Sequence, residues 1–287
     1  MSPSAYRALC LLIALALGTS VARTQPLVVR HVTPDARTGA ENDYFVELLD
    51  LALRKAGKPY RREVSPLDLY QGRALILLQR GEALDVVWTM TSAEREAMPG
   101  IRPIRFALQQ GLIGYRLLLV NAADTARFCA LDDPAELKHL TAGQQHDWPD
   151  TQILQANGFR VVTAPSYQTL FRMLQHRRFD YFPRSVLEIW DEAARYAGQG
   201  LVVDRCLLIQ YPAAVYFFVR EEDVELAERL ETGLQRALED GSYRALFLEH
   251  YGAALQQARL HARRRIVLEN PLLPPGTRIA PTLRPEN

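Results

Sequence analysis

The feature that most constrains the fold of this chain is an alternation of strand-type and helix-type segments near its N-terminus. Short apolar runs and stretches with helical spacing follow one another in the order 27–32, 45–55, 60–64, 67–80 and 84–90. The connections are short, so successive strands should lie parallel, with the intervening helices packed on the faces of the sheet. We therefore predict an α/β fold built on a largely parallel sheet.

The same alternation returns in the middle of the chain, from about Arg116 to Tyr211. Two strands then meet at Tyr211-Pro212, and two amphipathic helices follow. A second unit placed inside the chain predicts two lobes, the second inserted into the first. We expect lobe 1 to contain residues 23–114 and 212–260, lobe 2 residues 115–211, and a proline-rich tail residues 261–287.

The composition is that of a globular protein. Of the 287 residues, 48% are hydrophobic and 23% are charged, and the length suits one large domain or two ordinary lobes. Lys plus Arg number 34 and Asp plus Glu number 33, so the basic excess of a nucleic-acid-binding domain is missing. We expect no nucleic-acid partner.

Residues 1–22 are typical of a secretory signal peptide. Arg7 precedes the apolar run 8–17, and Ser20-Val21-Ala22 supplies the small residues of a cleavage site. The run is too short for a comfortable membrane span, which makes an uncleaved anchor the weaker interpretation. We expect an exported chain cleaved after Ala22, with a net charge near zero once Arg7 is removed.

The C-terminal tail and the cysteines allow alternatives. Five prolines beyond residue 270 predict a tail that lies along the surface or is disordered, and Arg263-Arg264-Arg265 is either a solvated charge run or a contact for an anionic partner. Cys129 and Cys206 remain in the exported chain, either as one disulfide or as two buried thiols. The six histidines show no metal-ligand spacing, so we expect no metal.

A candidate binding site lies where the strand 84–90 ends. Thr89, Thr91 and then Arg95 follow one another at its carboxyl end, the edge at which open α/β sheets bind ligands. An arginine offers a planar pair of donors that suits a carboxylate. The alternative is that Arg95 is a solvated helix residue paired with Glu94 or Glu96.

These segments together resemble the amino-acid-type solute-binding proteins of family 3, which have the type II periplasmic-binding fold. The resemblance covers roughly Leu27 to Gly252. It is carried by Gly81-x-x-x-Asp85-Val86-Val87, Thr89-Met90-Thr91 with Glu94-Arg95, Gly111-Leu112-Ile113, Tyr167-x-x-Leu170-x-x-Met173-Leu174, Arg178-Phe179-Asp180, and Asp240-Gly241-Ser242-Tyr243-x-x-Leu246-Phe247. It implies a monomeric periplasmic protein that captures a small carboxylate-bearing solute by hinge closure for an ABC-type importer, without catalysis or cofactor.

The resemblance also implies site residues. Arg95 would hold the ligand carboxylate with help from Thr89 and Thr91, although the spacing is one residue longer than the common Thr-x-Thr-x-Glu-Arg. Two places depart from the family. Residues 143–148 replace the usual Gly-Thr or Gly-Ser loop, and Pro183-Arg184-Ser185 stands where the amine-binding acid is usual.

Asp147 or Asp150 is then the replacement acid, or the ligand is a di-anion held by Arg95 and Arg184. Arg184 has an alternative role in a salt bridge to Glu188 or Asp191. The expected ligand-binding residues are Arg95, Thr89, Thr91, Trp148, Asp147, Arg184 and Tyr115.

Two other functions fit the same scaffold. Cyclohexadienyl dehydratases resemble these binding proteins, and such an enzyme would need an acid from Glu41, Asp147 or Asp180. A binding protein that signals to a membrane receptor would use the same ligand residues. A serine hydrolase is disfavoured because the sequence has no Gly-x-Ser-x-Gly elbow.

Overall fold

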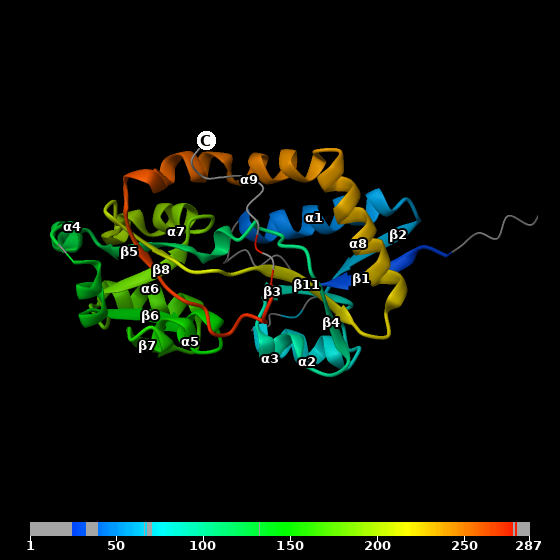
Figure 1. The fold of residues 1–287 in the computed structure, drawn as a ribbon, viewed down its shortest axis with the longest axis horizontal. Helices are drawn as coiled ribbons and strands as arrows, with labels where there is room; N and C mark the ends of the chain where they lie inside the picture. Colours follow the sequence, from blue (N-terminus) through cyan, green and yellow to red (C-terminus); the bar gives the residue numbers. More distant parts are fainter. Residues whose placement is uncertain are drawn as a thin grey trace, which may run out of the picture.

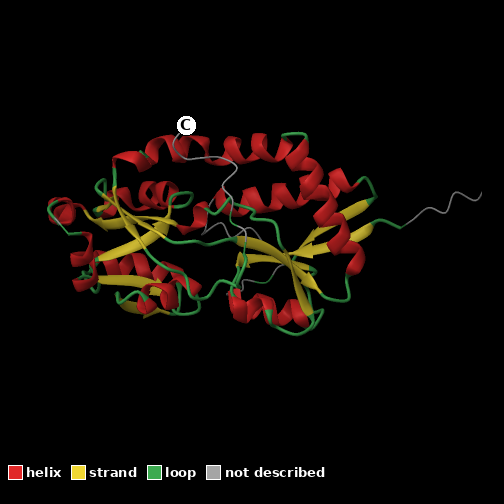
Figure 2. Cartoon of the chain, viewed as in Figure 1, coloured by secondary structure: helices red, strands yellow, loops and turns green. Residues whose placement is uncertain are grey.

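The computed structural model describes residues 25–32, 40–65, 67, 71–131, 133–277 and 279. The expected signal peptide, residues 1–22, lies outside the described residues. The fold contains two sheets side by side, each covered by helices (Figures 1 and 2), and we call each sheet with its helices lobe 1 and lobe 2. Within the described part of the chain, no helix is long and apolar enough to cross a membrane.

The sheet of lobe 1 has the order β2-β1-β3-β11-β4. Its strands are β1 (Leu27–His31), β2 (Tyr60–Val64), β3 (Val86–Met90), β4 (Ile101–Ile104) and β11 (Val215–Arg220). The first three strands are parallel, as the alternation predicts, and β11 enters antiparallel between β3 and β4. β3 is the central strand of this sheet and is largely buried.

Helices cover both faces of this sheet. They are α1 (Ala40–Ala56), α2 (Gln71–Gln79), α3 (Ala93–Glu96), α8 (Val224–Glu239) and α9 (Ser242–Ala258). In Figure 1, α1 and α9 lie above the sheet, α2 and α3 lie below it, and α8 descends past β1 on the right. Gly233 permits close packing of α8 on α1, because a Cβ at this position would overlap the backbone of Ala52.

The sheet of lobe 2 has the order β12-β10-β5-β8-β6-β7, with β9 also paired to β5. Its strands are β5 (Tyr115–Asn121), β6 (Thr141–Gln145), β7 (Arg160–Ala164), β8 (Tyr181–Ser185), β9 (Leu201–Val203), β10 (Leu207–Gln210) and β12 (Arg264–Val267). Its helices are α4 (Thr125–Cys129), α5 (Pro149–Ala156), α6 (Tyr167–Gln175) and α7 (Ile189–Tyr196). Short 3-10 helices lie at η1 (Leu112–Gly114), η2 (Ala122–Asp124), η3 (Pro134–His139), η4 (Ala197–Gln199) and η5 (Leu260–Ala262).

Two adjacent segments connect the lobes, one leading into β5 and one leaving β10. They touch at Gly114, whose carbonyl accepts a hydrogen bond from the amide of Tyr211 at 3.1 Å. A Cβ on Gly114 would overlap the Tyr211 carbonyl oxygen, so only glycine allows this approach. The residue boundaries that we assigned to the lobes remain a prediction.

The C-terminal segment forms a third connection. Of the two alternatives that we gave for the tail, disorder is wrong at β12, where the chain runs along the edge of the lobe 2 sheet. Residues 264–267 pair in parallel with β10 and extend the sheet of lobe 2. The strand fits because its side chains alternate: Ile266 is 7% exposed and Val267 is 71% exposed. Sequence reasoning missed it because the edge it completes lies more than fifty residues earlier in the chain.

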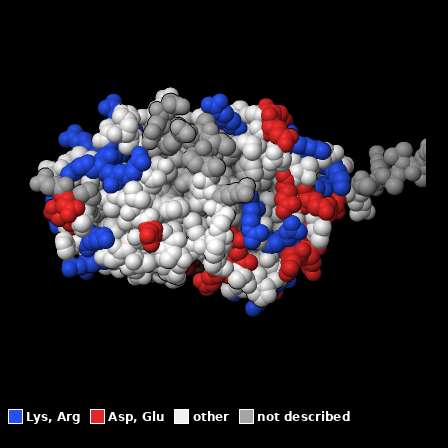
Figure 3. Space-filling model, viewed as in Figure 1, with Lys and Arg blue, Asp and Glu red and all other residues white. Residues whose placement is uncertain are grey.

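The arginine run 263–265, which leads into β12, is solvated only at Arg265, because Arg263 and Arg264 are half-buried. Arg263 donates to the carbonyl oxygen of Asp204 at 2.6 Å, and Arg264 donates to that of Cys129 at 2.7 Å. Cys129 and Cys206 are joined by a disulfide that ties α4 to the start of β10. These contacts fasten the C-terminal segment to lobe 2. Figure 3 shows Lys, Arg, Asp and Glu mainly towards the two ends of the viewed face, with both signs present at each end.

Candidate functional site

A cavity of about 160 Å³ lies between the lobes, at the carboxyl end of β3. Three separate segments form it: α3 of lobe 1, the start of α5 in lobe 2, and the C-terminal segment after β12. The lining residues are Ser92, Ala93, Glu94, Arg95, Asp147, Pro149, Gln152, Pro271 and Leu272. The place agrees with the rule that α/β sheets bind ligands beyond the ends of their strands.

Arg95 is held at this cavity by the turn between β3 and α3. Ser92 caps α3 by accepting from the Arg95 amide at 3.2 Å, which starts the helix and directs the arginine back over the strand end. The side chain is 8% exposed. The Arg95 guanidinium donates to Thr89 Oγ1 at 2.6 Å, to the Met90 carbonyl at 2.8 Å and to Gln71 Oε1 at 3.2 Å.

The same guanidinium reaches across to lobe 2. Arg95 Nη2 donates to the carbonyl oxygen of Asp147 at 3.3 Å. Burial lowers the pKa of Arg95 below its ordinary value, while the charges of Asp147 and Asp150 offset part of this effect. Because arginine ordinarily titrates above about pH 12, the group stays cationic at physiological pH. The acceptors that the Arg95 guanidinium contacts are neutral: the Thr89 hydroxyl, the Gln71 amide oxygen and the backbone carbonyls of Met90 and Asp147.

Asp147 supplies the opposite charge in the same cavity. It follows β6 and precedes α5 in lobe 2. Its carboxylate atom Oδ1 is buried and has no hydrogen-bond partner within the described part of the chain. A buried carboxylate oxygen without a donor is costly, so this atom marks a place where a ligand or water donor would be favourable.

The two threonines support the site from behind. The Thr89 hydroxyl donates to Gln71 Oε1 at 2.9 Å and accepts from Arg95. The Thr91 hydroxyl donates to Glu96 Oε1 at 2.6 Å. Neither residue lines the cavity. The structure therefore places Thr89 as an orienting partner of Arg95 and Thr91 as a partner of Glu96.

Arg184 lies inside lobe 2, away from the cavity lining. Arg184 belongs to β8, four residues before Glu188, the N-cap of α7, and it is 5% exposed. Its guanidinium contacts Glu192 Oε1 and Glu188 Oε2, each at 2.7 Å. Burial lowers the pKa of Arg184, but the two glutamates raise it by more, to well above its ordinary value. The alternative of a salt bridge to Glu188 is the arrangement observed.

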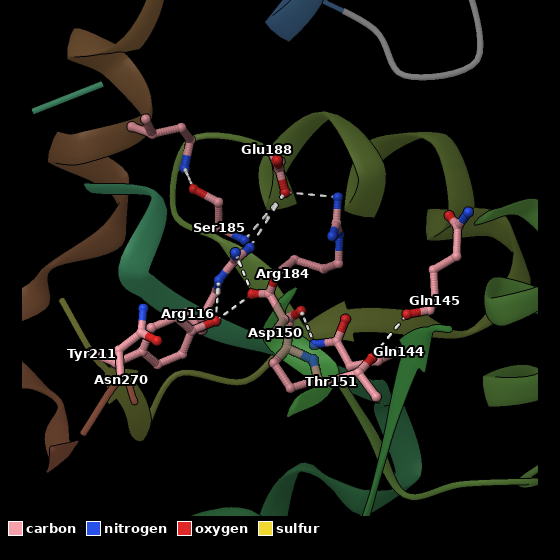
Figure 4. Close-up of polar contacts among 12 residues, drawn as sticks. Arg116, Gln144, Gln145, Asp150, Thr151, Arg184, Ser185, Glu188, Tyr211 and Asn270 are labelled. Atoms are coloured by element: carbon pink, nitrogen blue, oxygen red, sulfur yellow. Dashed lines mark hydrogen bonds and ion pairs between the residues drawn. The ribbon is translucent and has the colours of Figure 1, made fainter. Parts of the chain in front are cut away.

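A second buried group adjoins this one (Figure 4). Arg116 of β5 forms an ion pair with Asp150, and its Nε donates to the Tyr211 hydroxyl at 2.9 Å. That hydroxyl donates in turn to Asp150. Glu188 lies 3.9 Å from Arg116 and so joins the two groups. Asp150 is thus bonded within lobe 2, so of the two candidate aspartates Asp147 is the one that lines the cavity, to which lobe 1 adds Glu94.

The two aromatic candidates lie away from the cavity lining. Trp148 packs into lobe 2, with the Arg184 guanidinium 4.8 Å from its ring centre and the Phe182 ring stacked at 6.3 Å. Tyr115 begins β5 beside the interlobe connections, and its hydroxyl accepts from Gln210 Nε2 at 3.1 Å. Both side chains are half-buried.

Sequence reasoning missed part of the cavity wall. Gln152 lies near the start of α5, five residues after Asp147, and this closeness in sequence was the available signal. Pro271 and Leu272 lie in a proline-rich stretch, where no local pattern indicated a wall. Gln71 is the first residue of α2, and nothing in its neighbourhood pointed to Arg95.

The described residues offer a poor fit to a metal ion. One group, Cys129, Asp204 and Cys206, brings its ligand-type atoms close together. Its two sulfurs are bonded to each other and so cannot act as thiolate ligands.

A further acid considered for catalysis, Asp180, accepts from Arg127 at 3.1 Å and from the Thr141 amide at 2.7 Å, and it does not line the cavity. The side chain of Glu41 lies outside the described residues.

Comparison with known proteins gives structural neighbours. No model of a known protein family matches the chain. No curated protein matches it either. An ancestral arginine-binding protein bound to arginine shares 18% identity at a TM-score of 0.59, over 78% of this chain and 98% of its own.

Two further neighbours have the same TM-score. A periplasmic His/Glu/Gln/Arg/opine family-binding protein from Silicibacter pomeroyi, in complex with lysine, shares 17% identity over 78% of this chain and 97% of its own. The GluR0 ligand-binding core in complex with L-glutamate shares 12% identity over 79% of this chain and 99% of its own. The chain therefore has the two-lobed type II periplasmic-binding fold of the family 3 amino-acid-binding proteins that its sequence resembles.

Proposed function

We propose that this chain is a periplasmic solute-binding protein that holds a small amino-acid-like zwitterion in the cavity between its lobes. One observation carries the proposal: Arg95 and Asp147 come from different lobes and line the same cavity. A guanidinium suits a ligand carboxylate, and the open carboxylate oxygen of Asp147 suits an ammonium group. A di-anion is disfavoured because Arg184, the second cation it would need, is paired with two glutamates.

The arrangement also suits binding by closure of the hinge. Lobe 1 provides Arg95 and lobe 2 provides Asp147, so a ligand that contacts both residues stabilises the closed state relative to the open one. The cavity would hold roughly five water molecules, which limits the ligand to a small molecule. We infer further that the protein acts as a monomer without catalysis and delivers its ligand to an ABC-type importer, with a sensing receptor as the alternative recipient.

A thermal-shift screen of the chain from residue 23, freed of bound ligand by unfolding and refolding, tests the proposal. The panel contains amino acids, dicarboxylates, polyamines and prephenate. A ligand at 100 times its dissociation constant adds about 2.7 kcal/mol, which raises the melting temperature by several degrees. Stabilisation by an amino acid supports the proposal. Conversion of prephenate to a product would instead assign the chain to the dehydratases.

A further inference from the structure

The segment that follows β12 is attached to lobe 2 first. The Leu268 amide donates to the Gln210 carbonyl at 2.8 Å, which continues the pairing of β12 with β10. Glu269 then makes two backbone hydrogen bonds to the Asn157 side chain, at 2.8 and 3.2 Å. Asn157 ends α5, the helix whose start lines the cavity. This end of the segment is therefore fixed to the lobe 2 wall of the site.

The next residues pass over the interlobe connection to lobe 1. Asn270 Nδ2 donates to the carbonyl of Pro212, in the segment that joins β10 to β11, at 2.8 Å. Asn270 Oδ1 accepts from the Leu272 amide at 3.0 Å, which turns the chain towards α3. The Leu272 carbonyl then accepts from the amide of Ala93, the first residue of α3, at 2.7 Å.

The segment is also a wall of the cavity. Pro271 and Leu272 line it together with Arg95 of lobe 1 and Asp147 of lobe 2. In Figure 1 the segment runs in red from lobe 2 to α3 near the centre of the molecule. It thus lies on both lobes and on the hinge at once, beside the two charged residues of the site.

We propose that residues 268–272 form a strap that holds the cleft closed and releases α3 when the lobes separate. The two ends are unequal. On lobe 2 the strap continues a paired strand. On lobe 1, among the described residues, its backbone contact is the single hydrogen bond from Ala93 to Leu272, and beyond the strap Ile279 packs against the lobe 1 core. A rotation that separates the lobes would break the weaker end first. The strap rests on the hinge motion of the proposed function but does not depend on which ligand is bound.

The contact at Ala93 can be removed without disturbing α3. Ala93 is exposed, and proline is well suited to the first position of a helix, where it lacks only the N–H that donates to Leu272. The preceding residue, Ser92, already has the extended conformation that proline requires, with φ −149° and ψ 161°. Ala93→Pro therefore deletes the donor, and Ala93→Ser is the matched control that keeps it.

The test measures the distance between the lobes in the purified, ligand-free chain by single-molecule energy transfer. Dyes are attached to Glu228→Cys in α8 and Gln155→Cys in α5, both exposed positions. Ala93→Pro should raise the ratio of open to closed molecules about two- to tenfold, the range expected for one lost hydrogen bond, and Ala93→Ser should leave it unchanged. Asn270→Ala, which frees the strap from Pro212, should act in the same direction.

The strap proposal would be overturned if the distance distributions of Ala93→Pro and Asn270→Ala were unchanged while circular dichroism showed both variants folded. Should Ala93→Pro not fold, Asn270→Ala alone decides. Because no ligand is present, this result is separate from the thermal-shift screen, whose failure would overturn the proposed ligand and leave the strap in place.

Discussion

Arg95 and Asp147 face one cavity from opposite lobes, and the Arg95 guanidinium donates to the Asp147 carbonyl at 3.3 Å. The Asp147 carboxylate atom Oδ1 is buried and has no partner within the described residues. The pair therefore presents a cation and an anion to whatever enters between the lobes. A ligand with a carboxylate and an ammonium group would satisfy both.

Replacing Asp147 by asparagine should weaken amino-acid binding about ten- to a hundredfold, because a hydrogen bond between charged groups contributes about 1.5–3 kcal/mol. The side chain keeps its size, so the free energy of unfolding should change little. Isothermal titration against an amino-acid ligand measures the effect, with the exposed Asp191→Asn as the control. Equal affinity in Asp147→Asn and the parent chain would exclude Asp147 from the ligand contacts.

Replacing Arg184 by alanine should destabilise the fold by about 3–5 kcal/mol, because Glu188 and Glu192 would be left buried without their cation. Urea unfolding measures the loss. The control is Arg172→Ala on the exposed face of α6, for which a change within about 0.5 kcal/mol is expected. In the folded fraction of Arg184→Ala the ligand affinity should persist, and its selective loss would return Arg184 to the binding site.

His31 should make the fold sensitive to acid. It is fully buried at the end of β1, and burial lowers its pKa below the ordinary value of 6.5. Below pH 6.5 the unfolded chain binds a proton that the folded chain does not, so stability falls with falling pH until the folded pKa is reached. The slope should approach about 1.4 kcal/mol per pH unit.

Urea unfolding at pH 7, 6 and 5 measures this slope. His31→Gln should show a shallower loss than the parent chain between pH 6.5 and 5, and the exposed His261→Gln should not differ from it. Identical slopes in His31→Gln and the parent chain would show that His31 does not cause the acid sensitivity.

Two glycines should respond in opposite directions to alanine. Gly114→Ala places a Cβ against the Tyr211 carbonyl between the interlobe connections and should destabilise the fold by about 1–3 kcal/mol. Gly72→Ala in α2 meets no atom within 4 Å and should stabilise it by about 0.5–1 kcal/mol. Thermal unfolding of both variants is the check, and a neutral Gly114→Ala would mean that the connections separate easily.

Local sequence patterns predicted the features that depend on residues close together in the chain. The alternation of apolar runs placed β1, β2 and β3 with the helices between them, and the hydroxyl-rich end of β3 pointed to Arg95. Predictions failed for features that depend on contacts between segments far apart in the sequence. β12 forms because β10 offers it an edge, and Pro271 reaches the cavity because the chain returns from lobe 2. For Arg184, spacing offered Glu188 or Asp191 as partners but could not show that Glu192 lies beside it.

The most direct test of the account compares three small molecules on the ligand-free parent chain by thermal shift. They are an amino acid that stabilises the chain, the same acid without its amino group, and the same amine without its carboxylate. We predict a rise of several degrees with the amino acid at 100 times its dissociation constant and little rise with either half-ligand, because Arg95 and Asp147 each need their own partner. Equal stabilisation by the deaminated acid, or stabilisation by no amino acid at all, would contradict the account.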